Sequence, residues 1–488
     1  MPYGYAGVYT YDYNDNCSKI YQAFISLHIQ AGQQGLVAEM KAHPYNLMTI
    51  YLADYEDCIL LLLNCDKNEY DQRIDHLQQR IDMLDKGDPS SPWFRFCKAG
   101  VYLHWAIAEI RFGNQYRALM DFRKSYTLLK DNQQLFPGFE YNAVFAGLEE
   151  AVVGALPASY KWMASVFGIK GDIKKGTEKL AVFVNTHTGS QPMRSETVLY
   201  YLYARFYLLS EQQQVWDYLC NREFNTRDNL LNAFTKTTIA LDYRKADEAI
   251  STLQLASSNP DYSNYPIFDY QQGMAMLTRL DSMSVSAFLH YISKTKSDIY
   301  IKDSWQKMAF AWYVNNNMAK ADYCLKQIKT QGNTRLDADK QASRFAESGH
   351  WPLCPLLQAR LLIDGGYYAH ALAILNQIPI STLTNSADKA EYYFRLGRVY
   401  EETATGNNTA QNTKQALAYY RSAMSAGKNR HEQFAARAAL QTGRIYERLN
   451  MKAEALDMYK QCLDMPAHDF QNSIDQQAKA GINRVSEG

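Results

Sequence analysis

The sequence predicts an all-α fold built from stacked pairs of antiparallel helices, and three observations support this prediction. Apolar residues recur at spacings of three and four along almost the whole chain, as on the buried face of a helix. We find no alternating apolar and polar run bounded by turn dipeptides, which is the pattern of strands. Glycine and proline mostly occupy short connections that leave segments of about 12 to 25 residues, the size of helices and helix pairs. These connections include Gly87 to Pro92, Pro137-Gly138, Asn185 to Pro192, Ser258 to Pro266 and Gly349 to Pro355.

Chain length and charge limit the architectures and the kinds of partner that this sequence is expected to have. A chain of 488 residues exceeds the size at which one hydrophobic core stops growing, so we expect two packed sub-domains or an elongated repeat array. Lys plus Arg and Asp plus Glu both number 51, and no block of like charge occurs. This balance argues against nucleic acid or an anionic membrane as the main partner. The 37 tyrosines suit many half-buried rings whose hydroxyls reach water.

The cysteines and the apolar runs give no sign of a disulfide framework or a membrane span. The 8 cysteines are scattered without a CxxC pair, so we expect most of them to be small buried residues. The longest aliphatic run, Ile59 to Leu63, is far shorter than the roughly 20 residues of a membrane-spanning helix. Met1 to Asn16 lacks the basic start and apolar centre of a signal peptide, which indicates either no export or a signal omitted from the sequence.

Internal repeats give the most specific signal. A helix-turn-helix unit of about 34 residues needs small residues at fixed positions so that its two helices can touch, and large residues that fill the space between pairs. The last unit has Gly443 and Ala455 at the small positions and Tyr446 and Tyr459 at the large ones, and Pro466 follows its second helix. The template fits best at residues 302–330, 352–379, 390–427 and 436–467.

The repeats are uneven. In the unit at 390–427, Ala416 follows Gly397 by nineteen residues where the template expects twelve, and the polar stretch Thr405 to Gln411 supplies the insertion. We therefore expect a longer turn there. A further repeat-like pair is predicted near 102–129. The sequence thus predicts an irregular tetratricopeptide-repeat-like α-solenoid at 186–488, preceded by an N-terminal helical lobe at 1–185.

The segment from Phe145 to Phe183 carries a family resemblance. A helix is expected to end near Gly154, Pro157 suits the start of another, and Gly168 and Gly171 interrupt the chain before a third. This order resembles the tetratricopeptide-repeat proteins typified by the yeast inclusion body clearance protein, which have animal and bacterial relatives. The similarity extends to Trp305–Trp312, Leu396–Tyr400 and Gly443–Tyr459, from about residue 80 to residue 485.

The resemblance implies a helical-repeat fold with adaptor-like roles, linked in eukaryotes to protein quality control and lipid homeostasis, and it implies no catalytic residues. Relatives in Bacteroidetes-type genomes carry an export signal before a Tyr- and Asn-rich start similar to Tyr11–Cys17. The resemblance therefore suggests the cell envelope, as a periplasmic protein, if a signal has been omitted. The alternative is the cytoplasm.

The inner surface of such an array is lined by fixed positions of the first helix in each pair. Some relatives clamp the C-terminal carboxylate of a peptide there with a Lys and Asn pattern, which these units lack. Arg and Glu alternate at these positions, as they would also do in ion pairs within a helix. We predict this groove as the candidate binding site, with Phe310, Tyr313, Phe394, Arg398, Glu401, Arg444 and Glu447 as its candidate residues.

Motifs for catalysis, metal binding or cofactor binding are missing. Gly171 to Thr177 lacks the Lys and Ser or Thr that a phosphate loop needs, and it fits a helix start. His187 and His350 have no further ligands at metal-site spacing, and HExxH and GxSxG do not occur. The adjacent carboxylates Glu149-Glu150 and Glu401-Glu402 are expected on solvated helix faces. We predict no cofactor, no metal and no catalytic residue.

The predicted function is a non-catalytic scaffold or adaptor that binds a protein or peptide partner, with no nucleic acid and no transmembrane segment. The alternative is a carbohydrate-binding or carbohydrate-active helical protein, either a toroidal enzyme or a surface glycan-binding protein, as the richness in Tyr and Asn suggests. A third hypothesis is a membrane-associated adaptor that uses Ala151 to Val166, although core packing also explains those apolar residues.

Overall fold

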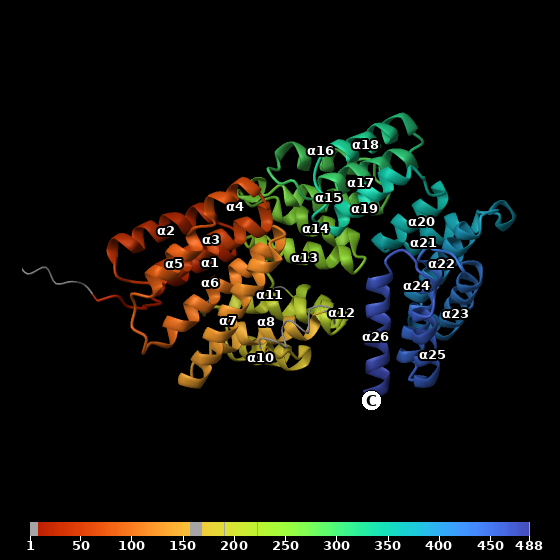
Figure 1. Cartoon of the computed structure of the whole chain (residues 1–488). Coiled ribbons are helices and arrows are strands. Elements are labelled where there is room, and N and C mark those ends of the chain that lie inside the picture. The colour runs from red at the N-terminus through yellow and green to blue at the C-terminus, as the bar shows by residue number, and fades with distance from the viewer. Residues whose placement is uncertain (1–7, 157–167, 190, 222, 488) are drawn as a thin grey trace, which may run out of the picture.

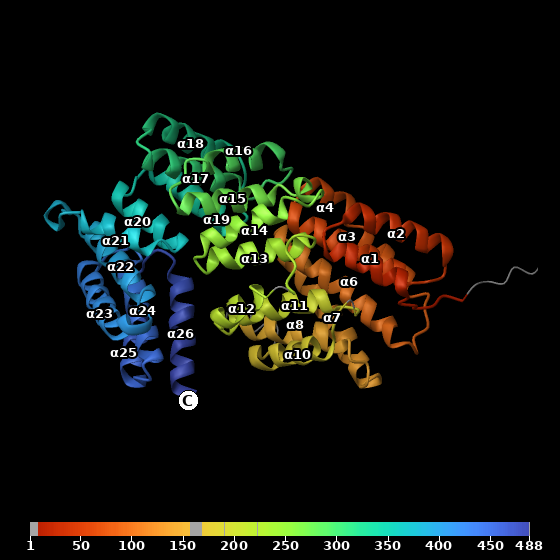
Figure 2. The same cartoon turned by 180° about the vertical axis from the view of Figure 1, so that it is seen from behind.

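The computed structural model describes residues 8–156, 168–189, 191–221 and 223–487. Over these residues the elements are helical, and the one β pairing is an isolated bridge between Thr10 and Asn46. The helices stack in chain order, and the chain then turns so that the C-terminal helix α26 lies on the side of the last repeats that is turned toward α12 (Figures 1 and 2). The prediction of an all-α fold is confirmed.

The first part of the chain forms a bundle around aromatic side chains. The largest fully buried side chains here include Tyr21, Tyr51, Tyr55 and Phe96, so the core depends on rings packed edge to face. The helices are α1 (Asp15–Ile25), α2 (Ile29–Ala42), α3 (Met48–Asn64), α4 (Lys67–Arg73), α5 (His76–Leu84), α6 (Pro92–Arg111), α7 (Gln115–Leu135), α8 (Asn142–Ala155) and α10 (Ile173–Thr186).

Glycines bring α8 and α10 into backbone contact. A Cβ atom on Gly176 would lie 2.5 Å from the Ala151 nitrogen, and one on Gly171 would lie 2.2 Å from the Gly154 nitrogen. Asp172 caps α10 by accepting a hydrogen bond from the Lys175 N–H at 3.0 Å. This confirms the predicted helix start. The helix predicted from Pro157 and most of the proposed membrane face, Ala151 to Val166, lie outside the described residues.

The middle of the chain continues the core of the first part. One cluster of buried side chains contains Phe24 and Phe96 together with Leu230 and Phe268. Helices on both sides of residue 185 therefore share a core, and the division there remains a prediction. The middle helices are α11 (Arg194–Tyr203), a π-helical turn at Ala204–Leu208, α12 (Gln212–Leu219), α13 (Leu230–Asp242), α14 (Ala246–Ala256), α15 (Ile267–Thr278) and α16 (Ser284–Lys294).

The last part of the chain contains the predicted repeat pairs. The four best template fits correspond to α17 with α18, α20 with α21, α22 with α23 and α24 with α25; α19 is an extra helix after the first pair, and α26 ends the array. Their bounds are α17 (Ile301–Val314), α18 (Met318–Thr330), α19 (Asp337–Ser348), α20 (Cys354–Gly365), α21 (Tyr368–Asn376), α22 (Ser386–Glu402), α23 (Thr409–Ala426), α24 (Phe434–Arg448), α25 (Lys452–Leu463) and α26 (Gln471–Glu487).

The small and large template positions pack as expected. A Cβ atom on Gly397 would lie 2.5 Å from the Tyr420 ring, and one on Gly443 would lie 2.6 Å from the Tyr459 ring. The polar insertion forms a longer connection, residues 403–408, with a short 3-10 turn at Gly406–Asn408, whereas α24 and α25 are joined by residues 449–451. The fold is therefore an irregular α-solenoid of tetratricopeptide-repeat type, as predicted.

The cysteines and the helix lengths agree with the sequence expectations. Cys17, Cys65, Cys97, Cys324 and Cys462 are buried, and the 8 cysteines are free thiols. Among the helices that the structure describes, none combines the length and the apolar character needed to cross a lipid bilayer.

Candidate binding groove and a buried polar network

A hollow of about 610 Å³ lies between the last repeats and the middle of the chain. Arg398 and Glu401 of α22 and Arg444 of α24 line one side, and the turn at Asp242–Arg244 after α13 lines the other. Arg244 forms an ion pair with Glu402 at 3.1 Å, which holds the two sides together. We call this hollow, with the inner faces of α22 and α24 that border it, the inner groove.

The inner groove is built by a repeated sequence pattern. Gly397-Arg398-Val399-Tyr400-Glu401-Glu402 in α22 matches Gly443-Arg444-Ile445-Tyr446-Glu447-Arg448 in α24. The glycine lets the tyrosine of the second helix approach, and the glutamate lies one helical turn further along. The two units therefore place the same chemical groups at equivalent points of the array.

In each unit the glutamate binds its own second helix and the next first helix. Glu401 accepts a hydrogen bond from the Tyr420 hydroxyl at 2.6 Å and pairs with Arg448 of α24 at 2.8 Å. Glu447 accepts from the Tyr459 hydroxyl at 2.5 Å and pairs with Arg484 of α26 at 2.7 Å. These contacts fix the stacking of α22, α24 and α26, because a carboxylate that accepts from two elements restricts both.

The arginines of the pattern have different surroundings. Arg398 pairs with Glu401 at 3.0 Å and with Glu402, and these carboxylates and Tyr420 raise its pKa although burial opposes this. Arg444 donates to the Gln477 side chain at 2.7 Å and forms no ion pair with a described residue. Loss of hydration in the groove wall lowers the pKa of Arg444, and the Arg398 and Arg484 cations act in the same direction.

The sequence explains why Arg398 has a second carboxylate partner and Arg444 has none among the described residues, since α24 has Arg448 where α22 has Glu402. A second exchange lies eleven residues, or about three turns, earlier, where Arg437 replaces Glu391. Arg437 is exposed, lies over the Phe470 ring at 5.5 Å, and has no ion pair among the described residues. The protein that surrounds it and the nearby cations, first of all Arg395, lower its pKa to about 10.

The structure brings together the four charged residues that the sequence singled out. Arg398, Glu401 and Arg444 line the hollow, and Glu447 lies on the same face of α24 beside Arg484. Arg437 is not among the site residues that the sequence predicts. A comparison of the charges at equivalent positions of α22 and α24 would have singled out Arg437, because α22 has a glutamate at that position.

The three aromatic candidates lie elsewhere. Phe310 is 5% exposed and packs against Phe345 of α19, the extra helix that covers this part of the array. Tyr313 packs against Trp351, and its hydroxyl donates to the Pro352 carbonyl at 3.0 Å. Phe394 is 4% exposed, between Tyr420 and Phe434. Phe310 and Phe394 therefore belong to the core, and we do not propose them as ligand contacts.

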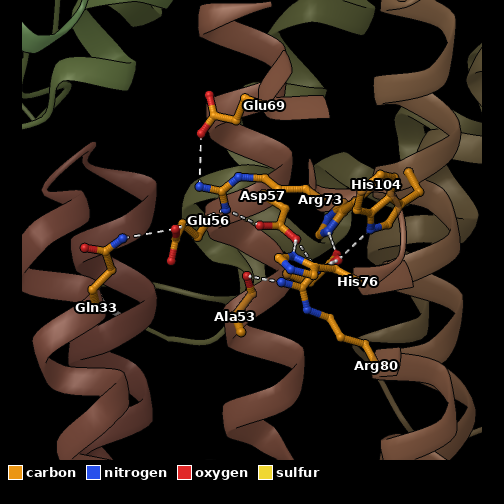
Figure 3. Close-up of polar contacts among 11 residues, drawn as sticks. Gln33, Ala53, Glu56, Asp57, Glu69, Arg73, His76, Arg80 and His104 are labelled. Carbon is orange, nitrogen blue, oxygen red and sulfur yellow. Dashed lines mark hydrogen bonds and ion pairs between the residues drawn. The ribbon is translucent and has the colours of Figure 1, made fainter. Parts of the chain in front are cut away.

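A second cluster of polar side chains lies in the N-terminal helices (Figure 3). Asp54 is fully buried in α3, and it accepts hydrogen bonds from Arg80 at 2.9 Å and the Trp105 indole at 3.0 Å, while His104 Nδ1 lies 2.8 Å from its second oxygen. One turn later, the Asp57 carboxylate lies within ion-pair distance of the Arg73, Arg80 and His76 side chains. The cluster thus connects α3 to α4, α5 and α6.

This network has the character of a structural contact. Burial raises the pKa of Asp57, but Arg80 and the hydrogen bonds from Arg80, Arg73 and His76 outweigh it and hold the pKa below its usual value. Each of the two carboxylates has three partners from the surrounding helices, as expected of a contact that holds helices together. Among the described residues, no group of His, Cys, Asp and Glu has an arrangement that could hold a metal ion.

Comparisons with known proteins support the repeat class. A family model described as "SusR N-terminal TPR domain" matches residues 339–474, which include the inner faces of α22 and α24. No curated protein sequence matches the chain. The chain thus contains tetratricopeptide-type helical repeats, while the narrower family typified by the yeast inclusion body clearance protein is not confirmed.

Similar solved structures include two helical proteins. One is described as the "APC/C hetero-tetramer Cut9-Hcn1", with 13% identity, coverage of 96% of this chain and 88% of that one, and a TM-score of 0.23. The other is the yeast Tom70, with 12% identity, coverage of 97% and 95%, and a TM-score of 0.22. TM-scores this low indicate that neither chain superposes closely on this one.

Proposed function

We propose that this chain is a non-catalytic helical-repeat scaffold that binds a protein or peptide partner in its inner groove. One observation supports the proposal most directly. Arg437 and Arg444 lie on the inner face of α24, and neither has a carboxylate partner among the described residues. The helices on either side satisfy their arginines with glutamates.

The electrostatics support binding. Two guanidinium groups that are crowded by like charges lower the stability of the free protein, as their lowered pKa values indicate. Groups whose charge is unfavourable in the free fold concentrate at functional sites, where a ligand compensates them. We therefore expect a partner to stabilise the last repeats when it binds.

The shape also suits a peptide. A hollow of about 610 Å³ is within the range of about 300 to 1,000 Å³ that is common for ligand sites. It is bounded by rigid helices on one side and by the Asp242–Arg244 turn on the other, so it would hold a short segment of a partner without a large rearrangement.

The carbohydrate alternative has no specific observation in its favour. The rings that would form a stacking platform are mostly packed against one another inside the helix stack, as in the pairs Tyr270 with Tyr300 and Tyr262 with Phe268. The single aromatic residue beside a second hollow, of about 580 Å³ near α4 and α16, is Tyr291, which is 2% exposed and donates to the Ile299 carbonyl.

A random peptide library displayed on phage, selected against the purified full chain, tests the proposal. We expect the recovered peptides to lose binding when Gln441, which lines the hollow, is changed to Trp. They should keep binding when Gln461, exposed on α25, is changed to Trp. Peptides that bind both variants equally would show that the inner groove is not the binding surface.

A further inference from the structure

We infer that the inner groove takes an internal acidic segment of a partner polypeptide, with two of its carboxylates held by Arg437 and Arg444. This inference rests on the proposed function and names the chemistry of the occupant. It follows from the charge of α24, from the contacts of each charged side chain around it, and from the spacing of the two arginines.

Two exchanges change the charge of the last inner helix face. At equivalent positions α22 has Glu391 and Glu402, whereas α24 has Arg437 and Arg448. The inner face of α22 therefore carries three glutamates and two arginines, and that of α24 carries three arginines and one glutamate. The charged residues are Glu391, Arg395, Arg398, Glu401 and Glu402 in α22, and Arg437, Arg444, Glu447 and Arg448 in α24.

Most of these charges are already paired. Arg395 pairs with Glu391 at 2.7 Å, Arg398 pairs with Glu401 and Glu402, and Arg448 pairs with Glu401. Glu447 is occupied by Arg484 and Tyr459. The cations left over are Arg437 and Arg444, so the net positive charge of this surface is concentrated on them.

The neighbouring helices add to this charge instead of compensating it. Arg360 on α20 and Arg395 on α22 both act on Arg437, and their repulsion exceeds the effect of Asp364. Arg484 on α26 and Arg398 on α22 repel Arg444, although the Glu401 carboxylate acts in the opposite direction. An anion placed between these helices would interact with several guanidinium groups at once.

The spacing of the two arginines predicts the pattern of the ligand. Arg437 and Arg444 are seven residues apart, so they share one face of α24 and lie roughly 10 Å apart along the helix axis. In a peptide with polyproline II conformation, which has three residues per turn and a rise of about 3.1 Å per residue, side chains three residues apart lie on the same side and are separated by roughly 9 Å. Each guanidinium group can bind one carboxylate through two parallel hydrogen bonds. We therefore expect Asp or Glu at positions i and i+3 of the bound segment.

The same spacing separates this site from a clamp for a chain terminus. One C-terminal carboxylate cannot reach two guanidinium groups that stand about 10 Å apart along a helix. Two acidic side chains three residues apart on one side of a polyproline II segment can reach both. The segment can therefore lie anywhere in the partner sequence.

Fluorescence anisotropy with labelled synthetic peptides and the full-length chain tests the inference. The probe is an N-acetylated, C-amidated twelve-residue peptide with two glutamates three residues apart in a background of serine, glycine and leucine. The matched peptide has glutamine at both positions. We expect the glutamate peptide to bind at least about tenfold more tightly, and its affinity to fall as the salt concentration rises.

The variants Arg437→Gln and Arg444→Gln should each weaken binding of the glutamate peptide about tenfold. The control is Arg421→Gln, because Arg421 is an exposed arginine on α23 outside the inner groove, and this variant should bind as the unchanged chain does. Thermal unfolding separates binding from structure. Loss of a crowded cation should leave the melting temperature of the two groove variants unchanged or raise it.

Several results would overturn the inference. Equal binding of the glutamate and glutamine peptides would show that charge is not recognised, and full binding by both groove variants would show that Arg437 and Arg444 are not the contacts. A requirement for a free C-terminal carboxylate would replace the internal segment with a terminus. In each case, the proposed function would stand if the phage-selected peptides still bound the unchanged chain and lost binding to the Gln441→Trp variant.

Discussion

Two buried glutamates of the N-terminal and middle helices are held differently from a buried glutamate of the last repeats, whereas the buried Asp57 of α3 is held by arginines as Glu401 is. Glu149 and Glu196 of the N-terminal and middle helices accept hydrogen bonds from hydroxyl groups, of Ser125 and Tyr55, and burial raises their pKa values to about 8 and about 7. In the last repeats burial also acts on Glu401, but the Arg398 and Arg448 cations outweigh it and lower the pKa. The same residue type is thus a neutral packing group in one region and a charged connector in the other.

The glycines show a parallel difference. At Gly176 the missing side chain leaves room for the backbone of Ala151, whereas at Gly443 it leaves room for the ring of Tyr459. At the crossing of α8 and α10 the helices touch directly, whereas at the contact of α24 and α25 a side chain reaches across.

The largest expected effect is at the helix contact of the first region. Gly176→Val should lower the free energy of unfolding by about 3 kcal/mol or more, because the new side chain meets backbone atoms that cannot rotate away. Urea denaturation measures the change. The control is Gly138→Ala, where nothing lies within 4 Å, and its effect should stay within about 0.5 kcal/mol. A Gly176 variant as stable as the control would contradict the described crossing of α8 and α10.

An intermediate effect is expected at the charged connector of the second region. Glu401→Gln should lower the free energy of unfolding by about 2 to 3 kcal/mol, since it removes the negative charge that pairs with the buried Arg398 and with Arg448. Glu454→Gln, on the exposed start of α25, should have almost no effect. Equal stability of the two variants would mean that Glu401 does not connect the repeats.

A smaller, pH-dependent effect should separate the regions. The pKa of Glu149 is about 8 in the folded chain and near 4.5 in the unfolded chain, so between these values the folded state binds more protons. Stability is therefore full below about pH 4.5 and falls as the pH rises toward 8. Glu149→Gln should remove this loss and be more stable than the unchanged chain at pH 8, by at least about 1 kcal/mol.

Denaturation at pH 5 and pH 8 measures this difference. The two proteins should be close in stability at pH 5, because most of the Glu149 carboxyl is neutral in the folded state there. The matched variant Glu150→Gln, whose partner is Lys179, should show no such gain at pH 8. A gain of the same size in both variants would contradict the raised pKa of Glu149.

Most of the fold could be predicted from the sequence, because repeat spacing reports helix contacts directly. Gly397 with Tyr420 and Gly443 with Tyr459 pack as their template positions require. The extra helix α19 was not expected, since Asp337–Ser348 is amphipathic but lacks the small template residues. As a result, Phe310 was assigned to an open surface, although it packs against Phe345 of α19, while Tyr313 packs against Trp351 in the connection after α19.

Charged residues were the harder part to predict. The expectation that Glu149 and Glu401 lie on solvated faces is wrong, because Glu149 is 2% exposed and the Glu401 side chain is 8% exposed. Single-helix reasoning fails here, since the partners Ser125, Tyr420 and Arg448 come from other helices. The buried Asp54 and Asp57 had a sequence signal, because they lie in a helix whose other residues are mostly apolar.

Hydrogen exchange measured by mass spectrometry on the full chain, with and without a phage-selected peptide, tests the central claim most directly. If the inner groove is the binding surface, exchange should slow in peptides that cover residues 386–402 and 434–448 and remain unchanged in those that cover residues 48–111. Slower exchange in α3 and α6 with none in α22 and α24 would contradict the account and would move the function to the N-terminal helices.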